Sequence, residues 1–425
     1  MAKSSKATKT VLLISSGYHL YREYLLRMIA QYARVWLLLD RDVQWERPYV
    51  VGSTRVDTLD VSAMVAAARG LPDDVVLDGV ICWDEIRVVH AAQVAEELGL
   101  PGGPALAVAR CRDKHQTRLA LAEAGVAQAR SVPVSSFTEA TSAADTIGYP
   151  VIVKPRALGA SLGVSLVNRS GDLAAAYAHA RNAHEDGVPY FDSGVLVEEY
   201  MDGPEISVDS AIAHGALTPM FLARKVTGYY PHFEEVGHVV DSADPLLCEP
   251  RVLEVLQASH RAVGYRTGIT HTELRLTATG PKIVEINARL GGDMIPYVGW
   301  VASGIDPGRV AVAIACGEAP AIESNACGVA AIRFFYPKCD ATVESVSVDN
   351  RLLPRAVDVA LPLASPGQRL VLPPNDHVSC RYGYAVVHGD TAEACDEAAQ
   401  AAEQAFELIV RPAAVVLAGW GHRTL

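Results

Sequence analysis

Short apolar runs alternate with amphipathic stretches over the first quarter of the chain. The runs Val11–Ser15, Val35–Asp40 and Gly79–Trp83 predict buried strands, and the stretches Tyr21–Tyr32 and Ile86–Leu98 have the spacing of helices. Strands that alternate with helices are typical of a parallel sheet covered on both faces. The pattern therefore predicts an α/β unit that ends near the LPGG turn.

The middle of the chain, residues 112–328, begins with an Ala-rich helix and continues mainly as strands. The helix is expected over Lys114–Ala124, and strands are expected over Val151–Lys154, Ser165–Asn168, Gly194–Glu198, Ile206–Ala213 and both arms of a hairpin over Ile269–Ala288. The last region is expected to hold a strand over Val329–Tyr336, a proline-rich connector near Leu361–Pro374 and a helix over Thr391–Leu408. We therefore expect three domains, over residues 1–111, 112–328 and 329–425.

The hairpin carries the most informative polar pattern. Turn residues at Thr277–Pro281 centre it on Thr279, so that Glu273 faces Glu285 and His271 faces Asn287. One face is then expected to show Thr272, Leu274, Val284 and Ile286. The other face is expected to gather His271, Glu273, Arg275, Glu285 and Asn287.

Two carboxylates that face each other on neighbouring strands repel, so their charge must be offset. A divalent cation with oxygen ligands can do this, with Asn287 as a further oxygen donor and Arg289 able to reach a negative group beside the metal. The alternative is a solvated polar face on which Arg275 neutralises a glutamate. The hairpin alone leaves both interpretations open.

An apolar strand ends at Lys154 and leads into a loop of small residues, Arg156–Gly163. Such a loop lets backbone N–H groups approach a phosphate oxygen, and a lysine at the end of an apolar strand needs an anion. The loop matches neither GxxxxGK[ST] nor GxGxxG and precedes no helix, which excludes the P-loop and dinucleotide-binding motifs. An ordinary hairpin turn is the alternative. Lys114, at a helix start, is a second candidate cation, with simple exposure as its alternative.

The segment VLVEEYMDGPE, residues 195–205, is expected to form a strand, a pair of acids and a turn before another strand. Such an edge can offer backbone groups to an adenine ring and a carboxylate to ribose hydroxyls. On its own the segment does not establish that role.

Composition and charge narrow the classes of function. The chain has 425 residues, of which 50% are hydrophobic and 20% charged, which is a globular composition. Its net charge of −12 disfavours a nucleic-acid or anionic-membrane partner, and its 7% of aromatic residues disfavours a base-stacking platform.

No apolar run approaches the roughly 18–20 residues of a membrane span. The N-terminal run VLLIS is too short for the core of a signal peptide. We expect a soluble cytoplasmic protein that binds neither nucleic acid nor membrane.

The eight cysteines are scattered, and no two have CxxC spacing, which excludes zinc-ribbon and thioredoxin motifs. In a chain of this length they are expected to be reduced and mostly buried.

The order of these motifs resembles the ATP-grasp superfamily of carboxylate–amine ligases. The motifs are DK, a strand with Lys-Pro and a Gly/Ser loop, EExxxGxE, and a hairpin with E…ExNxR. The resemblance covers about Gly79–Gly317 and, more loosely, both ends. The segments HTE, EINARLGGD and GID are most similar to those of bacterial L-amino acid ligases and carnosine-synthase-like enzymes. The resemblance implies an α/β fold with α+β lobes: a Rossmann-like N-terminal domain, a two-lobed ATP-grasp domain and a C-terminal α+β domain.

The resemblance also implies roles for individual residues. Lys114 and Lys154 would hold the α- and β-phosphates of ATP, under a loop formed by Gly159, Ala160, Ser161 and Gly163. Adenine would meet Glu198, Glu199 and Met201, and ribose would meet Glu205. One or two Mg²⁺ ions, with Mn²⁺ as an alternative, would be held by Glu273, Glu285 and Asn287. Arg289, Lys154 and Ser161 would act in catalysis, Arg289 by neutralising an acyl phosphate and then an oxyanion. The substrate would be bordered by Glu235, His238, Arg289, Gly291 and Gly292.

Two segments depart from the family's pattern. The loop has GASLG where many relatives carry more glycine and serine, and EEVGHVVDS has Asp241 near an expected proline. The segment Lys225–Asp241 is expected to lie over the substrate and, with the glycine loop, to shield a reactive intermediate from water. The alternative for Glu235 and His238 is an exposed loop.

The sequence thus predicts an ATP-dependent ligase for small molecules. It would activate a carboxylate, expected to be an amino acid or a related acid, as an acyl phosphate and couple it to an amine, releasing ADP and phosphate. One alternative is a ligase for a non-amino-acid carboxylate or an unusual amine in a specialised pathway. Another is a regulatory protein that binds a nucleotide without catalysis, which the presence of both lysines, both glutamates and Arg289 argues against. A homodimer is compatible with the sequence.

Overall fold

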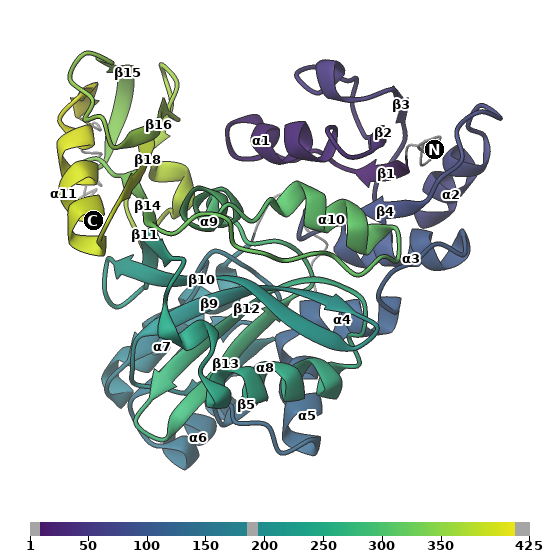
Figure 1. The fold of residues 1–425 in the computed structure, drawn as a ribbon. Coiled ribbons are helices and arrows are strands. Elements are labelled where there is room, and N and C mark those ends of the chain that lie inside the picture. The colour runs from purple at the N-terminus through teal and green to yellow at the C-terminus, as the bar shows by residue number, and fades with distance from the viewer. Residues whose placement is uncertain (1–8, 185–193, 413–425) are drawn as a thin grey trace, which may run out of the picture.

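The computed structural model describes residues 9–184 and 194–412, so residues 1–8 and 413–425 of the expected terminal domains lie outside the described residues. Figure 1 shows an N-terminal unit in purple and blue, a central part that runs from blue through teal to green, and a C-terminal part in yellow-green and yellow. Among the helices in the described ranges, none is both long and apolar enough to cross a membrane.

The N-terminal unit is a parallel sheet, as the apolar pattern predicts. Its strands β1 (Thr10–Ile14), β2 (Arg34–Leu39), β3 (Gly52–Arg55) and β4 (Gly79–Ile81) lie in the order β3-β2-β1-β4. On one face pack α2 (Val61–Arg69) and α3 (Val88–Glu97), and on the other α1 (His19–Ile29) and the later helix α10 (Pro307–Ala315). The pattern missed β3, because this edge strand, GSTR, has no large apolar side chain.

A small antiparallel sheet forms the first lobe of the central part. Its strands are β5 (Ser131–Val134), β6 (Val151–Pro155), β7 (Ser165–Val167) and β8 (Val195–Glu199), in the order β5-β8-β6-β7. The helices α6 (Phe137–Ile147) and α7 (Leu173–Asn182) cover the face that carries Val151 and Val153. Since strand side chains alternate, Ile152 and Lys154 point to the opposite face.

An eight-stranded sheet forms the second lobe and continues into the C-terminal part. Its strands, in spatial order, are β13 (Gly280–Asn287), β12 (Gly268–Thr277), β9 (Glu205–Ala213), β10 (Ala216–Gly228), β11 (Glu234–Asp241), β14 (Val329–Phe335), β18 (Gly383–Gly389) and β16 (Val357–Pro362). Because β11 pairs with β14, the sheet runs through the expected domain boundary at residue 328.

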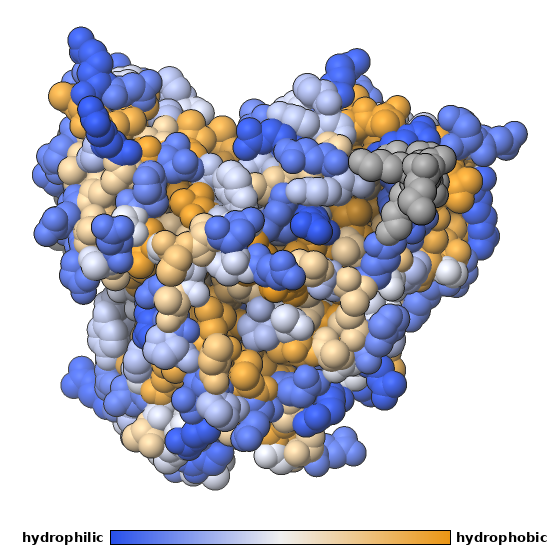
Figure 2. Space-filling view, viewed as in Figure 1, coloured by the Kyte–Doolittle hydropathy of each residue, from blue (hydrophilic) through white to orange (hydrophobic). Residues whose placement is uncertain are grey.

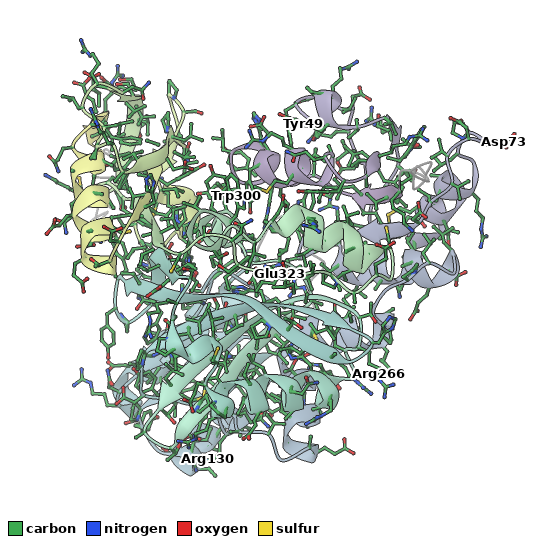
Figure 3. The ribbon with its side chains drawn as sticks, viewed as in Figure 1. Tyr49, Asp73, Arg130, Arg266, Trp300 and Glu323 are labelled. Atoms are coloured by element: carbon green, nitrogen blue, oxygen red, sulfur yellow. The ribbon has the colours of Figure 1, made fainter. Side chains whose placement is uncertain are left out.

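Helices cover both faces of this large sheet. On one face lie α4 (Ala105–Arg112), α5 (Lys114–Glu123) and α8 (Pro250–Val263), and on the other lies α9 (Ile295–Ser303). Trp300 of α9 lies where the N-terminal and C-terminal regions approach each other (Figure 3). The core is therefore shared by all three regions.

The C-terminal part adds a second sheet, β17 (Arg369–Leu370), β15 (Ala341–Val348) and β19 (Phe406–Pro412), and the helix α11 (Ala392–Glu403). The prediction of a helix through Leu408 was wrong, because α11 ends at Glu403 and β19 follows. In β19 Phe406 and Leu408 pack against the C-terminal core, two residues apart as in a strand.

The hairpin has the predicted register at its glutamates but not at its turn. Glu273 lies opposite Glu285, whereas Thr277 pairs with Gly280, and the register shifts by one residue between the two pairs. The extra residue is a bulge at Val284. Ile283 therefore joins Leu274 in the core, and the expectation that Val284 shares the apolar face was wrong.

The cysteines are free, as predicted, but they are not mostly buried. Cys248, Cys327 and Cys339 are exposed, three others are buried, and two are intermediate.

Candidate active site

A cleft between the small sheet and the β12–β13 hairpin gathers most of the residues singled out from the sequence. About 790 Å³ of this cleft is free of atoms, its open mouth included. The predicted residues that line it are Lys114, Lys154, Gly159, Ala160, Ser161, Glu198, Glu199, Met201, Glu205, Glu235, Glu273 and Glu285. The predicted residues outside its lining are Gly163, His238, Asn287, Arg289, Gly291 and Gly292.

Lys154 is buried at the end of β6 and finds an anion in Glu198 of β8, 2.7 Å from its Nζ. Arg118 of α5 donates to the same carboxylate through two hydrogen bonds of 2.8 and 3.0 Å. Burial lowers the pKa of Lys154. Burial alone would raise the pKa of Glu198, but the charges of Arg118 and Lys154 hold it well below its usual range. Two cations share one carboxylate, so this wall of the cleft has positive charge left for an anion.

Lys225, near the end of β10, lies among three carboxylates. Its Nζ is 2.9 Å from oxygens of Glu205, Glu235 and Glu273. Burial would lower the pKa of Lys225, but the three carboxylates raise it well above its usual value. Arg275 of the hairpin also pairs with Glu205, at 2.8 Å. Three acids and two bases leave this side of the cleft negative.

The facing glutamates of the hairpin are each paired with a lysine. Glu273 pairs with Lys225, and Glu285 lies 2.9 Å from the Nζ of Lys114. The amide nitrogen of Asn287 donates to Glu285 at 2.8 Å, which leaves the amide oxygen free of that bond. Burial would raise the pKa of Glu285, but Lys114 and Asn287 hold it well below its usual range. The carboxylates and the amide oxygen are the donor set that a hard divalent cation takes, so these residues fit Mg²⁺.

The glycine loop presents backbone donors to the cleft. Ala160 and Ser161 have φ angles of 52° and 56°. Their N–H groups donate no hydrogen bond to any of the residues that the structure describes. The Ser161 hydroxyl donates to the carbonyl oxygen of Phe233 at 3.1 Å. The loop therefore contacts the turn between β10 and β11 through this hydrogen bond. The N–H groups of Ala160 and Ser161 are available for an anion. Gly163 (φ 77°) lies behind the loop, where a Cβ would come within 2.7 Å of Pro155.

The expected lid over Lys225–Asp241 is built differently. Lys225–Gly228 and Glu234–Asp241 belong to β10 and β11, inside the large sheet, so the segment as a whole is neither a lid nor an exposed loop. Only residues 229–233 form a turn at the mouth of the cleft. The carbonyl oxygen of Pro231 accepts a hydrogen bond from the N–H of Leu166 at 3.0 Å.

Arg289 lies where the hairpin meets the N-terminal unit. Its guanidinium forms an ion pair with Glu85, which follows β4. Burial would lower the pKa of Arg289, but the charge of Glu85 raises it. A partner from a separate region thus fixes the orientation of this side chain.

The glycine turn after Arg289 is held by Asp209 of β9. One oxygen of Asp209 accepts a hydrogen bond from the N–H of Gly291 at 2.9 Å, and the other lies 2.5 Å from Nδ1 of His271. Burial would lower the pKa of His271, but Asp209 raises it to about 9. A Cβ at Gly291 would come within 2.9 Å of the same Nδ1, so the close approach requires glycine.

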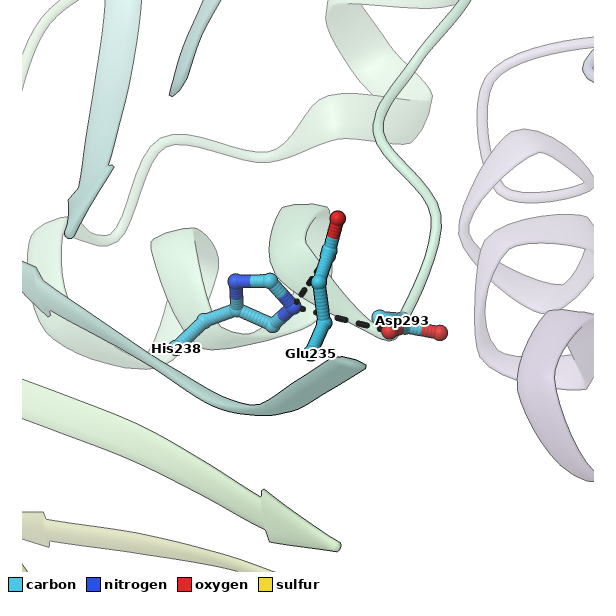
Figure 4. Close-up of side chains that lie close together, drawn as sticks. All are labelled: Glu235, His238 and Asp293. Atoms are coloured by element: carbon cyan, nitrogen blue, oxygen red, sulfur yellow. Dashed lines mark ion pairs between the residues drawn. The ribbon is translucent and has the colours of Figure 1, made fainter. Parts of the chain in front are cut away.

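Glu235, His238 and Asp293 meet beside the cleft (Figure 4). Nε2 of His238 is 3.3 Å from Glu235 and 3.6 Å from Asp293. Three such side chains could hold a metal ion, but Lys225 already pairs with Glu235, and Arg381 donates two hydrogen bonds of 2.8 Å to Asp293. Because the guanidinium of Arg381 occupies both oxygens of Asp293, we assign no metal to this cluster.

Sequence reasoning missed the partners that hold the predicted residues: Glu85, Arg118, Asp209, Lys225, Asp293 and Arg381. Each lies far along the chain from a residue that it contacts, although Lys225 is also only 10 positions from Glu235. The sequence could have indicated a buried role for Lys225, because this residue follows the apolar run Met220–Ala223 within a single strand. A charge inside a strand of a central sheet needs a buried partner.

The chain is similar to several known proteins. Residues 147–297 match the family described as ATP-grasp domain. The chain is 28% identical to the uncharacterized protein y4rH of Sinorhizobium fredii, over 84% of this chain and 73% of that one. It is 25% identical to the alanine–anticapsin ligase of Bacillus subtilis, over 56% of this chain and 54% of the ligase. It is 30% identical to carnosine synthase 1 of Gallus gallus, over 61% of this chain and 29% of the synthase. The chain thus spans about half the length of the alanine–anticapsin ligase and under a third of the length of the carnosine synthase.

Among solved structures, the L-amino acid ligase of Bacillus licheniformis has a TM-score of 0.79 to this chain. The match covers 96% of this chain and all of the ligase, at 19% sequence identity. At that identity the likeness shows the fold.

Proposed function

The chain belongs to the ATP-grasp superfamily and has its fold, and from this premise we propose that it is an ATP-dependent ligase that joins a carboxylate to an amine. One observation carries the proposal: two lysines, a loop with available N–H groups and a pair of ionised glutamates converge on one cleft. A triphosphate needs cations and N–H donors for its oxygens and ligands for its metal ion, and the cleft offers all of them.

ATP would occupy the cleft between the lobes. Its α- and β-phosphates would bind Lys114 and Lys154, and the loop residues Gly159, Ala160, Ser161 and Gly163 would cover its β- and γ-phosphates. Adenine would lie against Glu198, Glu199 and Met201. Arg118 and Lys154 hold the side chain of Glu198, so only its backbone is left for the base. Glu205 would bind the ribose hydroxyls.

Mg²⁺, as one or two ions, would be held by Glu273, Glu285 and the amide oxygen of Asn287, with Mn²⁺ as the alternative. When bound, it neutralises phosphate charge and polarises the phosphoryl group. The lysines that now pair with these glutamates would be released. Lys114 would turn to a phosphate, and Lys225 would keep Glu205 and Glu235 as partners.

The proposed reaction has two steps. A carboxylate oxygen of the donor attacks the γ-phosphorus, the bond from that phosphorus to the bridging oxygen of ADP breaks, and an acyl phosphate forms. The amine nitrogen then attacks the carbonyl carbon and loses a proton, and phosphate leaves. Arg289 would hold the acyl phosphate and then the oxyanion, because a guanidinium binds two oxygens at once. Lys154 and Ser161 would stabilise the phosphoryl group during its transfer.

The substrates in this proposal are small molecules. A relative named alanine–anticapsin ligase supports an amino acid as one of them. Glu235, His238, Gly291 and Gly292 would border them, since all four lie beside the cleft or beside Arg289. A cytoplasmic location and a homodimer belong to the same proposal. So does the domain division at residue 111, whereas the large sheet crosses the division expected at residue 328.

Nucleotide products test the proposal. The full chain is incubated with ATP, Mg²⁺ and pairs drawn from a panel of amino acids, other carboxylates and amines, and the nucleotides are separated by chromatography. We expect ADP and phosphate in equal amounts, only with an accepted pair. AMP and pyrophosphate would contradict the acyl-phosphate step. Tight ADP binding without cleavage for any pair would favour a regulatory protein.

A further inference from the structure

A second cleft lies between α1 and the C-terminal part. Its lining comes from α1, from the glycine turn after Arg289 and from the C-terminal connectors, and it encloses about 1290 Å³ free of atoms, its open mouth included. In Figure 2 the surface is notched between these two regions. The charged side chains in its lining are Arg22, Asp293 and Arg381.

The charges of this cleft do not cancel. Asp293 and Arg381 neutralise each other through two hydrogen bonds of 2.8 Å. Arg22 has no ion pair with any carboxylate in the described part of the chain, and its guanidinium donates to the carbonyl oxygen of Gly291 at 3.1 Å. Burial lowers the pKa of Arg22, and the charge of Arg289 lowers it too, against the opposing effects of Tyr24 and of the more distant carboxylates of Asp293 and Asp209. A partly buried guanidinium without a counter-ion is a site for an anion, and its planar fork fits a carboxylate.

The cleft adjoins the reaction site proposed above. Gly291, which accepts the hydrogen bond from Arg22, lies two residues after Arg289. On the other side, Asp293 lines this cleft while Glu235 lines the nucleotide cleft, and His238 lies within 3.6 Å of both carboxylates. A ligand in this cleft would thus lie beside Arg289, which would hold the acyl phosphate of the donor.

We propose that this cleft binds the amine substrate and that Arg22 holds a carboxylate of that substrate, so that the acceptor is an amino acid and not a simple amine. The inference rests on the ligase function proposed above. The reacting carboxylate of the donor cannot be the group at Arg22, because it becomes the acyl phosphate beside Arg289. We therefore assign a second carboxylate at this position to the acceptor, and the measurement with hydroxylamine below tests the alternative of a donor with two carboxylates.

Acceptor preference tests the inference. Arg22→Gln is compared with Arg27→Gln, which removes an exposed arginine from the same helix, α1. Each enzyme is offered L-amino acids and the corresponding amino acid amides, which lack only the carboxylate, and the amide product is measured by mass spectrometry. We expect wild type and Arg27→Gln to use the acids at least about tenfold better than the amides. Arg22→Gln should lose this preference through a higher KM for the acids, and Arg22→Lys should keep part of it.

Three results would overturn the inference. The first is an unchanged KM for the acids in Arg22→Gln, and the second is a wild-type preference for the amides. The third is a higher KM of Arg22→Gln for the donor when hydroxylamine replaces the acceptor, because that would place the donor at Arg22.

Thermal unfolding separates this inference from the ligase function. The full chain is melted with each L-amino acid or its amide, without ATP. We expect at least one acid, and not its amide, to raise the midpoint of wild type and Arg27→Gln but not of Arg22→Gln. If this shift occurs while no pair supports ATP cleavage, the ligase function fails and the anion site stands. If ATP is cleaved without an acid-specific shift or preference, the assignment of Arg22 fails.

Discussion

Glu285 is ionised although it lies in a buried pocket, since Lys114 and Asn287 outweigh the effect of burial on its pKa. Its place opposite Glu273 makes it a metal ligand in the proposed function. We predict that Glu285→Gln lowers the rate of ADP formation about 10²–10³-fold, as expected when a group that stabilises developing charge is lost. The fold should persist, because Glu285 contributes nothing to the apolar core. ADP release and a thermal melt measure the two effects.

The matched control for this change is Glu344→Gln. Glu344 also pairs with a cation, Arg411, but on the surface of the C-terminal part. It should retain wild-type activity. A fully active Glu285→Gln with a raised melting midpoint would instead support a metal-free polar face, in which the change only relieves repulsion from Glu273.

Arg118 ties the two lobes of the central part together. It holds Glu198 of the small sheet, and it donates to the carbonyl oxygens of Ile283 and Val284 in the hairpin at 2.8 and 2.9 Å. We predict that Arg118→Met lowers the free energy of unfolding by about 3 kcal/mol, because breaking a buried ion pair leaves a charge and several acceptors unpaired. Urea unfolding of Arg118→Met and of Arg169→Met, which removes an exposed arginine paired with Asp172, makes the comparison. Equal stability of the two variants would contradict the prediction.

At the scale of residues, sequence reasoning succeeded where the partners are close along the chain. The register of a single hairpin brought Glu273 to Glu285, and a strand with its loop placed Lys154 beside Ser161. It failed where the partner arrives through the tertiary fold. Nothing local relates Arg22 to Gly291, which is 269 positions away.

At the scale of elements, apolar periodicity predicted the central strands and failed at edges and irregularities. The wholly buried β1 was evident, but the edge strand β3 was not, because half of its residues are exposed and none is large and apolar. The bulge at Val284 was also invisible, since a bulge changes the pairing of two strands and not the alternation within either one. The bulge turns a single side chain from the core to the cleft.

Packing of α8 on the large sheet predicts a pH-dependent stability. His260 of α8 is buried, its Nδ1 donates to the carbonyl oxygen of Leu256 at 2.7 Å, and its Nε2 lies 2.8 Å from the hydroxyl of Thr270 on β12. Burial lowers its pKa to about 4. Because the unfolded chain binds this proton first, near pH 6.5, acid favours unfolding. We predict that stability falls as the pH drops from about 6.5 to about 4.

The variant His260→Asn isolates this contribution. At neutral pH the variant should be less stable than wild type, since one hydrogen bond of the imidazole is lost. Between about pH 6.5 and pH 4 the difference should shrink by about 3 kcal/mol, because only wild type carries the buried imidazole. Urea unfolding across this range measures the difference, and His388→Asn, which changes an exposed histidine, is the control. A constant difference at all pH values would refute the assignment.

At the scale of the whole molecule, the site is built by all three regions. The N-terminal unit supplies Glu85 to Arg289, and the C-terminal part supplies Arg381 to Asp293. The large sheet continues from β11 into β14, so the nucleotide cleft and the C-terminal part share one framework. The sequence indicated three regions, but it did not indicate that their boundary crosses a sheet, because strand pairing between distant segments leaves no local pattern.

The dependence of Arg289 on a distant region leads to the last prediction. If the donor is activated before the amine attacks, hydroxylamine should trap the acyl phosphate as a hydroxamate in the absence of the acceptor. We predict that Arg289→Lys forms hydroxamate more than about tenfold more slowly, because a point charge cannot reproduce a planar fork on two oxygens. Glu85→Gln should lie between the two enzymes, since it keeps the guanidinium but loosens its orientation. The coloured iron complex of the hydroxamate measures the rate. Equal rates in wild type and Arg289→Lys would remove Arg289 from the activation step. If an accepted pair gives amide but no hydroxamate, positional isotope exchange in ATP with the donor alone tests the same step, because it requires no trap to enter the cleft.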